Sequence, residues 1–209
     1  MVVLVVGLAV FAYAGPALVV REVTVTGVSV TRVAAVRQAA GIVPGRPLAQ
    51  VDVGAIDDRV RDLPFVAQVR VSRHLPGTVR VDVVPRQAAA LVPVAGGGYR
   101  IVDAGGVPFA RAAKPLRGVP VIKVSLAESA RPALQAALAV LAALPEPVRA
   151  KVGAVTASTP DDVRFTVGPA TVVWGSVERS DRKAAIYAAL RRTPAKVYDL
   201  SSPDTPVLR

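Results

Sequence analysis

The first twenty residues, MVVLVVGLAVFAYAGPALVV, contain no charged side chain, and Arg21 carries the first charge. Twenty apolar residues in a helix extend roughly 30 Å, which matches the hydrocarbon thickness of a bilayer. A core helix of a globular domain normally keeps a polar face, which this stretch lacks. The stretch therefore predicts a transmembrane helix over residues 1–20 that anchors the rest of the chain.

A cleaved signal peptide is the alternative. Ala12, Tyr13 and Ala14 followed by Gly15 resemble a small-residue cleavage site. A basic segment does not precede the apolar run, however, and the run continues past this site to Val20. An uncleaved anchor is favoured, and N-terminal sequencing of the mature chain separates the two, since cleavage would expose Gly15. Because every basic residue follows the span, we expect the reading frame to extend upstream into a basic cytoplasmic tail.

The composition excludes several function classes. The chain has no Cys and one His, so Cys/His zinc clusters and thiol chemistry are excluded. The net charge is +11, but the basic residues are scattered and aromatic residues make up only 4%, so we expect no nucleic-acid binding. The Val-, Ala- and Arg-rich usage is typical of GC-rich coding and suggests an actinobacterial source.

We find no residue pattern that favours catalysis, a metal or a cofactor. His74 follows a strand pattern and precedes a turn, with no nucleophile or paired acid near it in sequence. Asp57 and Asp58 are adjacent and do not face each other on a helix, while Asp161-Asp162 follows a proline in a turn. The run Gly96-Gly97-Gly98 lacks the Lys-Ser/Thr of a phosphate-binding loop. We therefore expect a binding protein rather than an enzyme.

Residues 21–86 alternate between strand and helix patterns. Val23 and Val25 alternate with polar residues, and a helix pattern follows up to Gly41. Asp52 is placed to cap a second helix, which Pro64 ends. Two alternating strands joined by Pro76-Gly77 then read as a hairpin. The order β-α-α-β-β predicts a small sheet covered by two helices.

Residues 87–209 predict a second domain of mixed α and β structure. Strands are expected at 99–102, 107–110, 119–124, 163–167, 171–175 and 197–200. Helices are expected from about Ser129 to Leu144, where three leucines share one face, and from Asp181 to Arg192 with Ser180 as the cap.

Several segments resemble one family. In the first domain these are Val25-Thr26-Gly27, Ala39-Ala40-Gly41, Gly45-Arg46-Pro47-Leu48, Leu63-Pro64-Phe65-Val66 and Arg73-His74-Leu75-Pro76-Gly77-Thr78-Val79. In the second, the matching motif residues are Trp174, Gly175, Lys183, Leu190 and Tyr198-Asp199. Together they resemble the bacterial cell-division family FtsQ/DivIB, although Val84-Pro85-Arg86 stands where that family usually has Glu-Arg.

The resemblance implies an α+β protein with three parts. These are a transmembrane anchor at 1–20, a POTRA domain at 21–86, and a C-terminal mixed α/β "β-domain" at 87–209 with an exposed edge strand. It implies a single-pass protein of the inner (plasma) membrane, with its C-terminal domains outside the cytoplasm at the division septum. A secreted basic wall-associated protein or enzyme with a cleaved signal is the alternative.

The resemblance also implies a binding mode. The strand after the last helix would take up a strand of FtsB, which forms a coiled-coil complex with FtsL, and so link both to septal peptidoglycan synthesis. The matching positions are Val197, Tyr198, Asp199, Leu200 and Ser201. Alternatively, Tyr198 packs on the sheet and Asp199 caps the strand end. The edge near Val23–Val25 could contact other divisome members.

Overall fold

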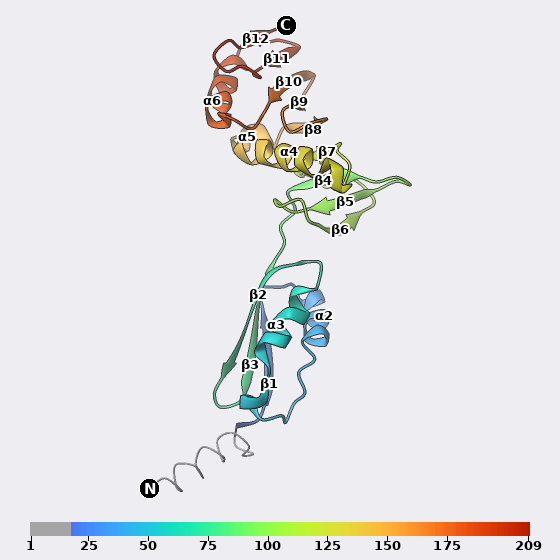
Figure 1. The fold of residues 1–209 in the computed structure, drawn as a ribbon, viewed down its shortest axis with the longest axis vertical. Coiled ribbons are helices and arrows are strands. Elements are labelled where there is room, and N and C mark those ends of the chain that lie inside the picture. The colour runs from blue at the N-terminus through green and yellow to red at the C-terminus, as the bar shows by residue number, and fades with distance from the viewer. Residues whose placement is uncertain (1–17) are drawn as a thin grey trace. The chain divides into compact units, whose positions relative to one another are not determined.

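A computed structural model describes residues 18–209 of the chain. The chain divides between Arg86 and Gln87 into two compact units, each with its own hydrophobic core (Figure 1). We describe each unit by itself.

The first unit is a three-stranded sheet with two helices. In chain order its elements are β1 (Glu22–Thr26), α2 (Val30–Ala40), α3 (Val53–Arg61), β2 (Val66–His74) and β3 (Thr78–Pro85). The sheet order is β1-β3-β2, with β1 parallel and β2 antiparallel to the central β3. The structure therefore confirms the predicted β-α-α-β-β order.

Local sequence signals explain how the first unit's helices are placed. The carboxylate of Asp52 accepts a hydrogen bond from the Ala55 amide at 3.0 Å, which caps α3 as predicted. Ile56 and Val60 follow at helical spacing and are buried against the sheet. On β3, Val79, Val81 and Val83 alternate with outward residues and complete this core.

Gly27, the residue that follows β1, lies close to the backbone of β3. Gly27 has φ +82°, a left-handed conformation that residues with a side chain rarely adopt. A Cβ at this position would lie 1.8 Å from the carbonyl oxygen of Val83. Glycine is therefore required here by both the backbone conformation and the neighbouring strand.

The predicted anchor differs from the structure at its C-terminal end. Val19 makes a bridge to Pro47, and Val20 is 1% exposed in the core of the first unit. The amide of Val20 donates to Arg46 O at 2.9 Å. The structure places Val19 and Val20 in the first unit, and residues 1–17 of the predicted span lie outside the described residues. In the described part of the chain, no helix combines the length and apolar character that crossing a membrane requires.

The second unit is built on one mixed nine-stranded sheet. Its strands are β4 (Ala90–Pro93), β5 (Tyr99–Val102), β6 (Pro108–Ala112), β7 (Val121–Ile122), β8 (Val152–Ala157), β9 (Val163–Val167), β10 (Ala170–Gly175), β11 (Val197–Asp199) and β12 (Val207–Leu208). The sheet order is β12-β11-β10-β9-β8-β7-β4-β5-β6. Its helices are α4 (Arg131–Ala143), α5 (Glu146–Arg149) and α6 (Ser180–Leu190).

Helices α4 and α6 supply the apolar layer over this sheet. Leu134, Leu138 and Leu141 lie on one face of α4 and are buried, as their spacing predicts. They share a core with Phe165 and Trp174 of the sheet. The predicted α+β class, with a β-α-α-β-β first domain and a mixed second domain, is confirmed.

Candidate partner-binding edge

Strands β10, β11 and β12 form one end of the nine-stranded sheet. β11 runs parallel to β10, with Tyr198 opposite Val172, and the crossover between them is α6. β12 then pairs antiparallel with β11, with Tyr198 opposite Leu208. The amide of Arg209 donates to Val197 O at 3.0 Å, and the amide of Val197 donates to Arg209 O at 2.8 Å. These bonds fix the position of β12 along β11.

The structure corrects the predicted edge strand. The strand after the last helix, β11, is not at the edge, because β12 covers its outer side. β12 is the outermost strand at this end, and none of the residues 18–209 pairs with its far side. Val207 and Leu208 are 42% and 37% exposed there. A two-residue strand carries no periodic pattern, and it lies beyond Tyr198-Asp199, the last of the motif residues.

The five residues predicted to bind the partner alternate between core and surface. Val197 and Asp199 are half-buried and Ser201 is exposed, whereas Tyr198 and Leu200 are buried. The Tyr198 hydroxyl donates to Thr193 O at 2.7 Å. The Asp199 carboxylate accepts hydrogen bonds from the amide and hydroxyl of Ser201. Tyr198 thus packs on the sheet and Asp199 bonds at the strand end, as the alternative interpretation describes, and partner binding at these five residues stays a prediction.

The motif residues Trp174 and Gly175 hold the end of β10 beneath this edge. Trp174 is completely buried, and its indole N–H donates to the Ser180 hydroxyl at 3.1 Å. Gly175 has φ +74°, and a Cβ there would lie 3.1 Å from Ser201. Leu190, the last motif residue, is half-buried against the same core. These residues act on the edge by positioning it.

Lys183 is the charged motif residue and is 1% exposed. Its ammonium group donates to Trp174 O at 2.9 Å and to Ser176 O at 2.8 Å, which ties the start of α6 to the end of β10. Burial lowers the pKa of Lys183 from its ordinary value of 10.5, and the nearby Arg179 adds to this effect.

We expect Lys183→Met to lower the free energy of unfolding by about 1–3 kcal/mol at neutral pH, because the buried carbonyl of Trp174 and the half-buried one of Ser176 lose their donor. In the parent chain the native-state pKa of Lys183 lies below 10.5, its ordinary value in the unfolded state. At a pH between these two values, Lys183 is protonated in the unfolded chain but has released its proton in the native chain. The parent therefore gains stability as pH rises through this window, and the Met variant does not. Urea unfolding of both chains across this pH range measures the difference.

Burial also raises the pKa of Tyr187, which opposes this gain at high pH. Both chains contain Tyr187, so its contribution cancels in the difference between them. A difference in stability that stays constant with pH would contradict a charged, buried Lys183.

The loop between β11 and β12 is fixed to the start of α6. The Asp204 carboxylate pairs with Arg179 and with Arg182, each at 2.7 Å. The hydrogen bond from Arg179 lowers the pKa of Asp204, so the pairs persist in mild acid. Pro203, beside it, is buried. Sequence analysis did not identify this clamp, because residues 179 and 204 are distant in the chain.

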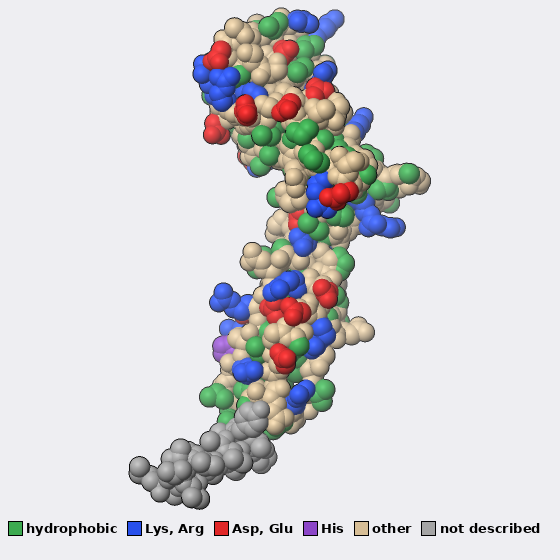
Figure 2. Space-filling view, viewed as in Figure 1, with side chains coloured by type: hydrophobic (Ala, Val, Ile, Leu, Met, Phe, Trp, Pro, Cys, Tyr) green, Lys and Arg blue, Asp and Glu red, His purple; other side chains and the backbone are tan. Residues whose placement is uncertain are grey.

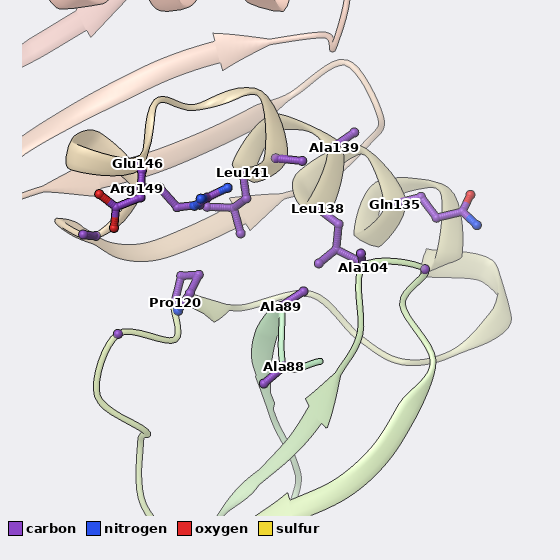
Figure 3. Close-up of a pocket in the computed structure, with 14 residues that line it drawn as sticks. Ala88, Ala89, Ala104, Pro120, Gln135, Leu138, Ala139, Leu141, Glu146 and Arg149 are labelled. Carbon is purple, nitrogen blue, oxygen red and sulfur yellow. The ribbon is translucent and has the colours of Figure 1, made fainter. Parts of the chain in front are cut away.

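An apolar groove of about 670 Å³ lies beside α4 in the second unit (Figure 3). Leu138 and Ala139 of α4 and Pro120 line it, and Glu146 and Arg149 lie at one end. It brings together no nucleophile, base and orienting group of the kind that catalysis needs.

The other chemical candidates are placed at the surface. His74 is exposed and contacts the Ser72 hydroxyl at 3.0 Å, while Asp57 pairs with Arg61 on α3. Asp162 bonds to Ser158 and Arg164 in a turn. Among residues 18–209 no three His, Asp or Glu side chains are grouped to hold a metal. Figure 2 shows basic side chains (blue) spread over this face with acidic ones (red) among them.

Comparisons with known proteins agree with this architecture. Residues 18–86 match the family model of the FtsQ-type POTRA domain, and residues 90–201 match that of the FtsQ/DivIB C-terminal region. The cell division protein FtsQ of Mycolicibacterium smegmatis is 36% identical over 208 residues, covering 99% of this chain and 62% of that protein. That of Streptomyces bingchenggensis is 36% identical over 200 residues, covering 90% and 75%.

FtsQ of Mycobacterium tuberculosis strain H37Rv is 33% identical over 205 residues, covering 98% of this chain and 65% of that protein. The chain thus spans less than two thirds of the length of these mycobacterial relatives. Mycobacterial and Streptomyces relatives also agree with the actinobacterial source suggested by composition.

Proposed function

Because the chain belongs to the FtsQ/DivIB family of cell-division proteins, we propose that it is a non-catalytic scaffold of the divisome. In this proposal an N-terminal anchor holds both units on the outer side of the plasma membrane at the septum. The second unit recruits an FtsB–FtsL-like complex and so links it to septal peptidoglycan synthesis. Family membership favours this function over a secreted wall-associated protein.

The outer edge of β12 is the observation that supports this binding mode. A terminal strand presents backbone N–H and C=O groups that a strand of a partner can complete. Arg209 directs its N–H and C=O toward Val197. Because backbone groups alternate in direction along a strand, those of Leu208 point away from β11. We assign Leu208 as the backbone contact of the partner strand.

The opposite edge of the same sheet is less suited to this role. β6 begins with Pro108, which has no N–H to donate, and carries the charged Arg111. Proline and charge are common features of edges that do not pair. Val207 and Leu208 instead present apolar side chains beside the outward backbone groups of β12.

In-cell photo-crosslinking tests the position of the site. We expect a photoreactive residue at Val207 to give an adduct with a small FtsB-like coiled-coil protein in dividing cells. Val107, equally exposed at 42% near the opposite edge, is the matched control and should give no such adduct. An FtsB-like adduct from 107 or from Thr24 alone would contradict the β12 assignment.

A proline variant tests the backbone mechanism. Leu208→Pro removes the outward N–H without removing a donor to β11, and it should abolish the adduct from position 207. Leu208→Ala keeps this N–H and should weaken the adduct only in part. Equal adduct yields from both variants would indicate that backbone pairing does not carry the interaction.

A further inference from the structure

Two loops of the first unit flank the point where the described chain begins. The amide of Gly45 donates to Val20 O, and that of Val20 donates to Arg46 O, at 2.8 and 2.9 Å. On the other side, the amide of Arg21 donates to Gly77 O at 2.8 Å. The loop after α2 and the β2–β3 turn therefore lie at the same end of the unit. Figure 1 shows this turn beside the start of β1.

Each loop presents a large apolar side chain to solvent. Leu75 in the β2–β3 turn is 75% exposed, and Val43 in the loop after α2 is 63% exposed. Leu18, half-buried, lines a small hollow together with Leu75 and Arg73. Single exposed apolar residues are common on protein surfaces, so exposure alone does not define a site. The loops that carry these two residues, however, contact Val20 and Arg21 from two sides, and the chain there continues from seventeen uncharged residues.

The charges at this end are mainly basic. Arg21, Arg46 and Arg73 are exposed there. Arg73 also donates to Val51 O at 2.7 and 3.1 Å, which holds its side chain against the segment that precedes α3. The two acids nearby, Glu22 and Asp52, already accept internal hydrogen bonds from Thr24 and Ala55. Apolar tips among arginines fit the interface of a bilayer, where acyl chains and anionic phosphates meet.

We propose that this end of the first unit docks on an anionic phospholipid surface, with Val43 and Leu75 entering the headgroup region and the arginines contacting phosphates. The inference rests on the proposed membrane anchor, and it adds that the first unit itself lies against the bilayer. Docking at two loops besides the anchor would restrict how the unit tilts on the membrane.

Site-directed spin labelling of the full chain tests this proposal. Because the chain has no Cys, Val43→Cys, Leu75→Cys and Val30→Cys each place a single label. Val30 is 89% exposed at the start of α2, which follows the far end of β1, and it is the matched control. In vesicles that contain phosphatidylglycerol, labels at 43 and 75 should become more accessible to oxygen and less accessible to a water-soluble nickel complex. The label at 30 should not change.

A flotation assay, which measures whether the chain stays bound to the same vesicles, distinguishes failure of the docking proposal from failure of the proposed anchor. If the chain floats with the vesicles but all three labels remain aqueous, the docking surface is overturned and the anchor stands. If the chain does not float, both the anchor and the docking that depends on it are overturned.

Discussion

Replacing Trp174 by alanine is expected to lower the free energy of unfolding of the second unit by about 3–5 kcal/mol. The side chain is fully buried, so its removal leaves a large cavity beneath the end of the sheet that is proposed to bind a partner. Its ring lies 5.7 Å from that of Phe165, and the indole N–H bonds to Ser180. The variant should therefore also lose the FtsB-like adduct from position 207.

The reason for this coupling is a row of aromatic side chains that ends at β11. Phe165 contacts Tyr187 at 6.3 Å between ring centroids, and Tyr187 contacts Tyr198 at 5.6 Å. Edge-to-face contacts of this kind add to the stabilisation from burial. Loss of the first member removes support from β10, α6 and β11 together.

Urea unfolding followed by circular dichroism measures the effect, with Trp174→Phe as the control. Phenylalanine keeps an aromatic ring beside Phe165 but loses the hydrogen bond to Ser180, so it should cost substantially less. An unchanged unfolding midpoint in the alanine variant would refute the supporting role of Trp174.

Gly27→Ala is expected to destabilise the first unit by about 4 kcal/mol or more. Alanine is disfavoured at φ +82°, and its Cβ would collide with the backbone oxygen of Val83. A backbone atom in a central strand cannot move aside as a flexible side chain can. The pairing of β1 with β3 must therefore shift or break.

Gly45→Ala separates the cost of the left-handed conformation from the cost of the collision with Val83. Gly45 has φ +83°, almost the same as Gly27, but nothing lies within 4 Å of a Cβ there. We expect Gly45→Ala to cost only about 1–2 kcal/mol, the price of the left-handed conformation for a residue with a side chain. Equal unfolding midpoints for the two variants would show that the contact with Val83 does not matter.

Elements with a regular pattern and a cap could be predicted from the sequence. Asp52 marked the start of α3, and alternating valines marked β3. β4 was missed because Ala90, Leu91 and Val92 are all buried, so the run shows no alternation between core and surface. β12 was missed because two exposed residues carry no pattern.

The candidate site was predicted in its region but not in its geometry. The side of the sheet that Tyr198 faces depends on register, and a three-residue strand does not define register by itself. Lys183 was recognised as a motif residue, but its burial depends on carbonyls of β10 that only the folded chain brings to it. Contacts between distant segments, such as that of Arg179 with Asp204, leave no local signal.

The order of strands in the second unit has a consequence for the time at which a partner can bind. β12 follows the other eight strands in the chain and pairs only with β11. During synthesis the chain emerges from its N-terminus, so β12, the strand proposed to bind a partner, arrives after the rest of the sheet. A chain interrupted before residue 207 would leave the outer side of β11 uncovered. If β12 binds a partner as proposed, only chains that extend through Leu208 would assemble.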